Sequence, residues 1–337
     1  MVDPVRIAVV GAGAWGINHV RAMSRTKGAK LVMVCDGAEA ALERARAIVP
    51  RARMECDIAA ALAASDVDAV VLATPARDHA EQARMVLNAG KHVLVEKPLA
   101  LDAADAHAVV SAAETHKRIL MVGHLMLFHP AVEKLKALID KGELGRVFYI
   151  YAVRVNLGRV RQDENALWSL APHDVSMIEY LLSDEPESVS ARGGTYLQSR
   201  IEDVVFVNLR FRSGVSAQIQ VSWLDPRKER RLTIVGSHKM VEFDDVHPVE
   251  KIRIYDKGVD RPPAFTEYAQ FLSIRNGDIH IPQIPMVEPL ERECHHFIDC
   301  ITQGKRPITD GHSALRVVRV LEAAQKSLES DGAPVAL

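Results

Sequence analysis

The first glycines of the chain have the spacing of a turn that binds a nucleotide phosphate. An apolar run at 6–10 leads directly into Gly11, Gly13 and Gly16, and a helical pattern follows. The first glycine permits the bend, the second lets the backbone approach a pyrophosphate, and the third lets the helix pack close to the strand. Free N–H groups at the helix start favour an anion, although a glycine-rich turn without a nucleotide is the alternative. The residues expected to contact a dinucleotide are Gly11, Gly13, Ala14, Trp15 and Gly16.

An acidic residue follows the second apolar run, where a dinucleotide presents its adenosine ribose. Asp36 comes twenty residues after Gly16. A carboxylate there can accept hydrogen bonds from both ribose hydroxyls, and it would repel a 2′-phosphate. Gly37 offers no cation that could offset this repulsion. We therefore expect the cofactor to be NAD rather than NADP.

Short β-branched runs alternate with alanine-rich helical patterns over the first third of the chain. This rhythm is typical of a parallel, doubly wound sheet, because each helical segment is long enough to cross over between parallel strands. We expect an α/β fold with an NAD-binding Rossmann domain over residues 1–123. The runs expected to form its strands are IAVV, LVMVCD, AVVLAT, HVLVEK and ILMVGH.

The pattern changes after residue 123. A helical stretch at 130–141 is followed by closely spaced strand-like runs and turn signals. These indicate a C-terminal α+β domain with a large, mostly antiparallel open sheet and helices on one face. We expect residues 124–337 to form this substrate and oligomerisation domain, with a long irregular segment at 258–289. Strands are expected at 146–157, 187–195, 203–212, 215–223, 230–236 and 251–255, and closing helices at 288–303 and 312–330.

Composition excludes several classes of partner. The formal net charge is −2, and basic residues alternate with acidic ones, so no nucleic-acid footprint is expected. No apolar run approaches the roughly 18 residues that a membrane span needs, and the chain does not open with a secretory signal pattern. The four cysteines lack CxxC spacing, which is typical of a reducing compartment. We expect a soluble, cytoplasmic protein that binds neither nucleic acid nor membranes.

Two further strings carry a family resemblance. Ala73-Thr74-Pro75 is followed by His79, and AGKHVLVEKPLA covers residues 89–100. With the glycine turn and the change to a sheet domain, they resemble the glucose-fructose oxidoreductase and inositol dehydrogenase (Gfo/Idh/MocA) superfamily over essentially the whole chain. The resemblance implies an NAD-dependent oxidoreductase, often with a cis Lys-Pro peptide. It also implies that Thr74, Pro75 and His79 lie near the middle of the cofactor, and Glu96 and Lys97 beside the nicotinamide.

Lys97 is the first candidate for catalysis. Oxidation of a secondary alcohol removes a hydride from carbon and a proton from oxygen. An amine beside the hydroxyl can accept that proton, and the ammonium can return it in the reverse direction. The alternative is a surface lysine that only ends a strand, and the resemblance argues against this alternative. We expect Lys97 to contact both cofactor and substrate.

His173 is the second candidate. Pro172 fits an early helix position, so His173 would lie in the first turn, where the helix dipole favours a neutral imidazole that accepts a proton. The family pattern has an aspartate four residues before the histidine, but this chain has Ser169 there. The division of labour between Lys97 and His173 therefore stays open. A histidine that only packs at a helix start is the alternative.

The segment before His173 contains candidates for substrate binding. Alternation along 151–156 places Arg154 and Asn156 on one strand face, and Arg161 and Trp168 follow. Guanidinium groups bind phosphate or carboxylate bidentately, so an anionic substrate would fit, although a solvated strand edge is equally compatible. The substrate-binding residues expected are Lys97, Arg154, Arg161, Trp168, Ser169 and His173.

The strings NLGRVR and LWSLAPHD look similar to the branch of the superfamily that acts on nucleotide-linked amino sugars, including UDP-N-acetylglucosamine 3-dehydrogenases. That resemblance implies a UDP-linked amino sugar as the substrate. The second hypothesis is a dehydrogenase or ketoreductase of free polyols or other sugar derivatives. A non-catalytic NAD(H)-binding sensor is a third, from another class, and the presence of Lys97 and His173 argues against it.

Two expectations concern metals and assembly. The cluster Cys294, His295, His296 and Cys300 lacks a second ligand pair at suitable spacing, so no metal is expected. A sheet with one uncovered face would expose apolar residues and form a symmetric homodimer or homotetramer. The row expected on that face is Val205, Val207, Leu209 and Phe211, against Phe206, Asn208 and Arg210.

Overall fold

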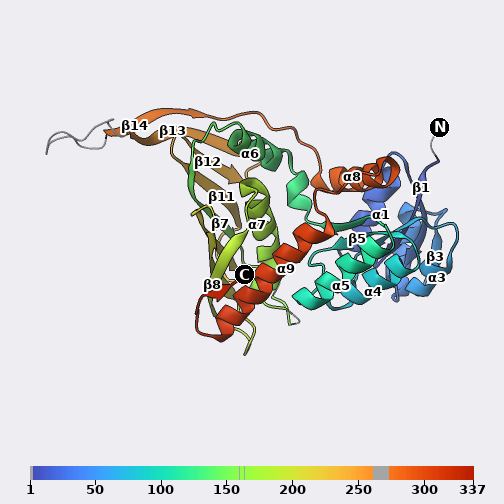
Figure 1. Cartoon of the computed structure of the whole chain (residues 1–337). Helices are drawn as coiled ribbons and strands as arrows, with labels where there is room; N and C mark the ends of the chain where they lie inside the picture. Colours follow the sequence, from blue (N-terminus) through green and yellow to red (C-terminus); the bar gives the residue numbers. More distant parts are fainter. Residues whose placement is uncertain (1–2, 159, 163, 261–272) are drawn as a thin grey trace. The chain divides into compact units, whose positions relative to one another are not determined.

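The computed structural model describes residues 3–158, 160–162, 164–260 and 273–337. The chain divides into two compact units (Figure 1). The first unit contains the chain up to His129 together with Val287–Glu322, and the second contains Pro130–Met286 and Ala323–Leu337. The expected boundary at 123/124 differs from this division. The physical reason is that helix α8 (Pro289–Gln303) packs on α1 (Gly16–Arg25) and on the 3-10 helix η1 (Leu125–Phe128) of the first unit (Figure 1).

The first unit contains the expected parallel sheet. Its strand order is β3-β2-β1-β4-β5-β6, and every pairing is parallel. The order reverses between β1 and β4, and ligands of such sheets bind at the carboxyl ends of the strands beside this reversal. The strands are β1 (Val5–Val10), β2 (Ala29–Cys35), β3 (Arg53–Glu55), β4 (Ala69–Leu72), β5 (His92–Glu96) and β6 (Leu120–Gly123).

Helices cover this sheet because their buried residues recur at helical spacing. In α1 the buried positions His19, Val20 and Met23 follow Gly16 at intervals of three or four residues. Met23 and Phe297 of α8 are both fully buried in one core cluster with Val9. No helix among the described residues is both long and apolar enough to cross a lipid bilayer. The remaining helices of this unit are α2 (Glu39–Ile48), α3 (Ile58–Ala63), α4 (Ala76–Asn88) and α5 (Ala103–Thr115).

The second unit is built on a nine-stranded sheet with the order β14-β13-β12-β11-β7-β10-β9-β8-β15. The pairing of β7 with β10 is parallel and the other pairings described are antiparallel, so the mostly antiparallel sheet is confirmed. Helix α7 (Ala166–Leu182) packs on β7, β9 and β10, and α6 (Pro130–Asp140) packs on α7. Helix α9 (Gly311–Glu329) contributes residues to both units. The strands are β7 (Val147–Val155), β8 (Pro186–Gly194), β9 (Val204–Phe211), β10 (Ser216–Ser222), β11 (Glu229–Gly236), β12 (Met240–Asp244), β13 (Ile252–Asp260), β14 (Ser273–His280) and β15 (Val335–Ala336).

Two expectations about this unit are wrong. The segment 258–289 is not irregular throughout, because β13 runs to residue 260 and 273–280 form β14, while 261–272 lie outside the described residues. Strand β14 pairs with β13, with Asn276 opposite Lys257. The alternation in β9 also has the opposite sense. The apolar row faces the core beneath α7, and the exposed row is Phe206, Asn208 and Arg210.

Candidate cofactor and catalytic site

The glycine turn has the shape that a dinucleotide requires. Gly11 has a φ of +88°, and a Cβ there would lie 2.6 Å from the carbonyl oxygen of Ala73. A Cβ at Gly16 would lie 1.9 Å from the carbonyl oxygen of Gly11, so this close packing needs glycine. A Cβ at Gly13 would meet nothing within 4 Å. The backbone at Gly13 is therefore open to an approaching pyrophosphate.

The helix that follows this turn leaves its positive end available. Helix α1 begins at Gly16 without a side-chain cap and without an acidic residue in its first turn. Uncapped N–H groups and the helix dipole together favour a bound phosphate. Ala14 and Trp15, at the rim of the turn, are exposed. These features fit a dinucleotide at the positions expected from the sequence.

Asp36 is fixed to the same turn. Its Oδ2 atom accepts a hydrogen bond of 2.7 Å from the backbone nitrogen of Ala12, and its Oδ1 atom accepts one of 2.8 Å from Ala38. Each carboxylate oxygen keeps a lone pair that can accept a ribose hydroxyl. The backbone contacts thus orient Asp36 without using up its acceptor capacity.

A cavity of 490 Å³ lies beside Asp36 within the first unit. Its lining includes two acidic residues, Asp36 and Asp57, and no lysine or arginine, so a 2′-phosphate would meet only negative charge. Sequence reasoning did not identify Cys56, Asp57 or Ile58, because β3 before them is too short to stand out as a strand. It also did not identify Gln82, which lies on α4. The lining residues are Val10, Gly11, Gly13, Cys35, Asp36, Gly37, Cys56, Asp57, Ile58, Ala73, Thr74, Pro75 and Gln82.

Thr74 and His79 are engaged by neighbouring groups. The Thr74 hydroxyl donates to Gln82 Oε1 at 2.7 Å. The buried His79 ring lies between two carbonyl oxygens, 2.7 Å from that of Pro98 and 2.9 Å from that of Thr74. His79 therefore links the loop after β4 to the loop after β5. In this arrangement its ring nitrogens contact the chain's own backbone.

Glu96 connects the end of β5 to the cofactor turn. Its Oε1 atom accepts hydrogen bonds from Trp15 Nε1 at 2.5 Å and from His19 Nε2 at 2.6 Å, and its Oε2 atom accepts one from the Lys97 backbone nitrogen at 3.1 Å. Only 6% of Glu96 is exposed, so its carboxylate faces α1. The Lys97-Pro98 peptide is cis, as the resemblance implies.

A second buried carboxylate, Glu293 of α8, lies against this group. Ligand atoms of His19, Glu96 and Glu293 all lie within 4.8 Å of one another. Burial raises the pKa of Glu293 well above its usual value, and the charge of Glu96 adds to this effect. Burial would also raise the pKa of Glu96, but the hydrogen bonds from His19 and Trp15 and the charges of His19 and Lys97 lower it overall. Sequence reasoning did not find Glu293, because α8 comes almost two hundred residues later.

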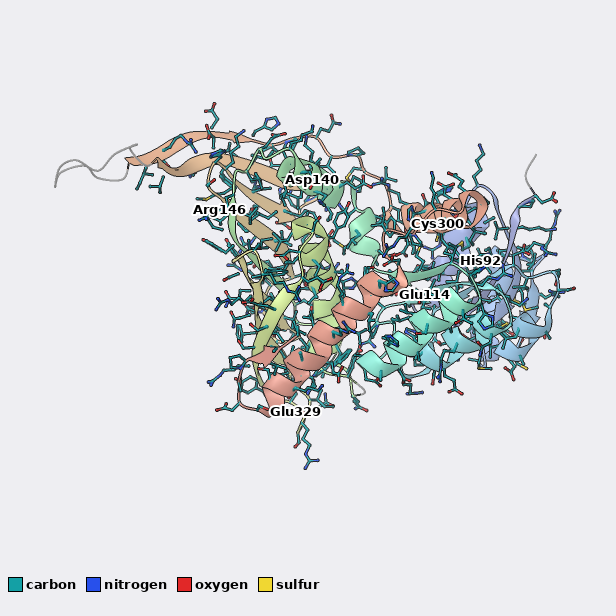
Figure 2. The ribbon with its side chains drawn as sticks, in the orientation of Figure 1. His92, Glu114, Asp140, Arg146, Cys300 and Glu329 are labelled. Atoms are coloured by element: carbon teal, nitrogen blue, oxygen red, sulfur yellow. The ribbon has the colours of Figure 1, made fainter. Side chains whose placement is uncertain are left out.

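The candidate metal cluster on α8 has other contacts. His296 Nε2 accepts a hydrogen bond of 3.0 Å from the Ile308 backbone nitrogen, and it lies 3.4 Å from Cys300 Sγ. Burial raises the pKa of Cys300 to about 11, so its thiol is protonated at neutral pH. Cys300 is marked on α8 in Figure 2. Among the described residues, the group whose ligand atoms approach closely enough for an ion is His19, Glu96 and Glu293 instead.

His124 is a further buried residue at the strand ends. The register of β5 with β6 pairs Glu96 with Gly123. Lys97 and His124 are therefore the next residues after these two neighbouring strands. Burial lowers the pKa of His124 to about 4, and the positive charge of Lys97 contributes. Its ring is therefore neutral at physiological pH. No motif in the sequence pointed to this residue.

In the second unit, the expectation for the start of the His173 helix is wrong. Helix α7 begins at Ala166, and Asn165 caps it by accepting a hydrogen bond of 3.2 Å from the Trp168 backbone nitrogen. Pro172 lies inside the helix, and His173 is its eighth residue. The dipole of the first turn therefore does not act on His173. Asparagine is a preferred cap, and this signal could have been read from the sequence.

Arg154 has a buried partner. Its guanidinium donates to both oxygens of Asp174 on α7, at 2.7 and 3.0 Å, and both side chains are at most 7% exposed. Burial would lower the pKa of Arg154, but the charge of Asp174 and its hydrogen bonds raise it. The bidentate face of Arg154 is thus occupied within the second unit.

The other expected substrate residues of this unit are spread over two segments. Arg161 is exposed and forms an ion pair of 2.9 Å with Glu164. Trp168, Ser169 and His173 lie on α7, where Ser169 and His173 share a face at a spacing of four residues. Within the first unit the structure brings the glycine turn, Asp36, Thr74 and Pro75 together around one cavity.

Comparison with known proteins identifies related chains. Residues 5–124 match the model of the oxidoreductase family with an NAD-binding Rossmann fold (GFO_IDH_MocA), and residues 132–242 match the GFO/IDH/MocA C-terminal domain. An inositol 2-dehydrogenase of Rhodococcus erythropolis is 40% identical over 190 residues, so the match spans about half of each protein (55% of both). An inositol 2-dehydrogenase of Rhizobium meliloti is 29% identical over 96% of this chain and 97% of its own length.

Solved structures agree on the fold. A putative oxidoreductase from Magnetospirillum magnetotacticum has a TM-score of 0.82 and 32% identity, covering 95% of this chain and 99% of that one. A UDP-N-acetylglucosamine 3-dehydrogenase from Acidithiobacillus ferrooxidans has a TM-score of 0.80 and 24% identity, with 98% and 99% coverage. At that identity the second likeness concerns the fold alone.

Proposed function

Since the chain belongs to the GFO/IDH/MocA oxidoreductase family, we propose that it is an NAD-dependent dehydrogenase of a secondary hydroxyl group on a free polyol or sugar. The observation that carries the proposal is the hydrogen bond from Trp15 to Glu96. It ties the residue before Lys97 to the helix that begins at the dinucleotide turn. An amine at this position suits proton transfer beside a nicotinamide.

The proposed reaction needs one hydride transfer and one proton transfer. Bound NAD supplies the hydride acceptor. Lys97 takes the hydroxyl proton on its amine in the oxidative direction and returns it in the reductive direction. His173 is the second acid-base candidate. Ser169 replaces the family aspartate, and the helix dipole does not act on His173, so Lys97 is the main acid-base group in this proposal.

A free polyol fits the second unit better than an anionic sugar. Arg154 is one of the two arginines expected to bind an anion, and its Nε and Nη2 atoms both donate to the buried Asp174. The two inositol 2-dehydrogenase relatives support the same substrate class. We therefore propose an inositol-like polyol as the first substrate to test.

A UDP-linked amino sugar is the second candidate. The exposed guanidinium of Arg161 favours it, because the partner of Arg161 is Glu164, three residues away, and a diphosphate could replace this carboxylate. The likeness of the fold to a UDP-N-acetylglucosamine 3-dehydrogenase is compatible with this choice.

A substrate panel separates these candidates. The protein is incubated with NAD and inositols, free sugars or UDP-amino sugars, and NADH formation is followed together with the mass of each compound. Loss of two hydrogens from an inositol supports the proposal, and the same loss confined to a UDP-amino sugar supports the second candidate. Tight NAD binding without turnover on any compound would favour a non-catalytic sensor instead.

A further inference from the structure

The carboxylate of Glu96 is a junction between three segments of the first unit. It accepts hydrogen bonds from Trp15 and His19 of the cofactor turn and α1, and from the backbone of Lys97 after β5. A carboxylate oxygen of Glu293 on α8 lies within 4.8 Å of the ligand atoms of His19 and Glu96. Two N–H groups donate to the same oxygen of Glu96, and an ionised carboxylate accepts such bonds more strongly than a protonated one. The geometry therefore suits an ionised Glu96.

The neighbouring backbone leaves room for this carboxylate. Gly123 pairs with Glu96 across β5 and β6. A Cβ at Gly123 would lie 3.1 Å from the Glu96 carboxyl carbon and within 3.2 Å of both oxygens. Any larger residue at 123 would press on the junction. The close approach shows that Glu96 has one tightly bounded position.

Glu293 has a different status from Glu96. It is fully buried, and within the described part of the chain neither of its oxygens has a hydrogen-bond partner. An ionised carboxylate in this environment would cost several kcal/mol. A proton on Glu293 removes that cost. The titratable groups around the pair are His19 from α1, Lys97 after β5, His124 after β6 and Cys294 beside Glu293.

A bound proton accounts for the close approach of His19, Glu96 and Glu293 better than a metal ion does. Glu96 Oε1 already accepts two hydrogen bonds, which occupy the lone pairs that a metal would need. The 2.6 Å separation of His19 Nε2 from Glu96 Oε1 fits a hydrogen between them. Glu96 Oε2 accepts a hydrogen bond from the Lys97 backbone nitrogen. The two oxygens of Glu293 have no partner among the described residues, and one proton neutralises that carboxylate.

We propose that Glu96 is a positioning residue, which holds the cofactor turn and the backbone of Lys97 in one arrangement, and that Glu293 is its uncharged buried partner. This inference rests on the proposed function, because it assigns Lys97 the reacting proton. Glu96 then acts through Trp15 and Lys97 rather than through contact with the nicotinamide. The cofactor turn and the acid-base residue are thereby fixed by one side chain.

The first test is Glu96→Gln, which removes the charge and keeps the shape. The amide oxygen can still accept from Trp15 and His19, but the amide NH₂ then faces the Lys97 N–H, and two donors repel. We expect kcat to fall at least about tenfold, since small misplacements of a reacting group are costly. We expect NAD affinity to change less than kcat. Gly123→Ala places a methyl group against the same carboxylate, and we expect it to lower kcat as well.

A matched control is Glu114→Gln on α5, marked in Figure 2. Glu114 is an exposed acid of the same unit, paired with His312 at 2.9 Å. Its substitution should leave kcat and NAD affinity at the wild-type values. If Glu96→Gln also keeps the wild-type kcat, the positioning role is refuted.

Chemical labelling of Lys97 tests the positioning role without requiring turnover, so it is independent of the proposed function. The labelling rate of Lys97 by an amine-reactive reagent is measured by peptide mass, with exposed Lys27 as an internal reference. A changed ratio in Glu96→Gln supports the positioning role even if no polyol or sugar is oxidised, and an unchanged ratio contradicts it. A wild-type protein silent on the substrate panel refutes the proposed function alone.

The second test concerns Glu293→Gln and the free energy of unfolding. A carboxyl group whose pKa is raised by folding stabilises the protein below its unfolded pKa of about 4.5, and this stabilisation is lost as the pH rises through the folded pKa. The contribution of Glu293 to the wild-type stability should therefore fall as the pH rises above roughly 4.5, and the stability of Glu293→Gln relative to the wild type should rise over the same range. Equal slopes in denaturant titrations across this range would show that Glu293 is ionised and would overturn its assigned role.

Discussion

The carboxylate of Asp36 accepts a 2.7 Å hydrogen bond from the backbone nitrogen of Ala12, inside the glycine turn. This bond joins the end of β2 to the segment where the pyrophosphate is expected. Asp36→Ala removes both this bond and the proposed contact with the ribose. We expect NAD affinity to fall about 10- to 100-fold, as for the loss of a charged hydrogen bond, while NADP affinity falls less. Isothermal titration with both nucleotides measures the ratio.

A control for this prediction is Asp66→Ala, because Asp66 is an exposed acid paired with Arg53 at 2.7 Å. It should leave both affinities unchanged. If native protein binds NADP more tightly than NAD, the role of Asp36 as a selectivity residue is wrong.

The buried ion pair of Arg154 and Asp174 should matter for stability more than for substrate affinity. Arg154→Met leaves Asp174 as an unpaired buried charge, and we expect a loss of about 3–5 kcal/mol in the free energy of unfolding. The double variant Arg154→Met with Asp174→Leu removes both charges and should recover much of that loss. Urea titrations of the wild type and both variants measure these differences.

The same variants test the substrate assignment. If the double variant folds but its KM for the best substrate of the panel rises well above the wild-type value, Arg154 binds substrate after all. An unchanged KM agrees with a structural role.

His124 should make the protein sensitive to acid. Its pKa is lowered from 6.5 to about 4 on folding, mainly by burial. Such a histidine contributes stability above its unfolded pKa, and this contribution is lost as the pH falls through about 4. Over this window the loss is at most roughly 3 kcal/mol. His124→Gln should reduce the difference in unfolding free energy between pH 7 and pH 4.

His92 offers a comparison for this measurement. It lies at the amino end of β5 (Figure 2), and burial lowers its pKa to about 4 as well. A His92→Gln variant should therefore retain the part of the acid sensitivity that belongs to His124. If His124→Gln keeps the full wild-type acid sensitivity, burial does not neutralise His124.

The uncovered face of the sheet is expected to mediate self-association. Tyr149 and Tyr151 stack at a centroid distance of 6.4 Å, and Phe206 is exposed. Large exposed apolar surfaces of this kind commonly form symmetric interfaces. We expect a homodimer or homotetramer, and we expect Phe206→Asp to lower the molar mass measured by light scattering after gel filtration. Tyr196→Asp, at an exposed position before β9, is the control, and a monomeric wild type would contradict the expectation.

The sequence predicted the first unit well because its signals are local. Buried parallel strands are continuous apolar runs, and the glycine turn has a fixed spacing, so β1, β2, β4, β5 and β6 were all expected. The short β3 has no such run, and Asp57 therefore went unnoticed. In the second unit, β14 lies in a segment expected to be irregular, and only its pairing with β13 reveals the strand.

Contacts between distant segments explain the remaining differences. Arg154 and Asp174 are twenty residues apart, and nothing local reveals that they neutralise each other. Glu293 reaches Glu96 only because α8 returns to the first unit. The start of α7 differs from the expectation for another reason, because proline fits a helix start but Asn165 is the residue that caps this helix.

In the proposed reaction Lys97 carries the reacting proton, and the Lys97→Ala variant tests this role. NAD affinity and kcat/KM are measured on the best substrate of the panel, since kcat/KM reports transition-state stabilisation. We expect NAD affinity within about threefold of the wild type and a loss of kcat/KM of at least about a hundredfold. A variant that turns over at the wild-type rate would show that Lys97 does not carry the reacting proton.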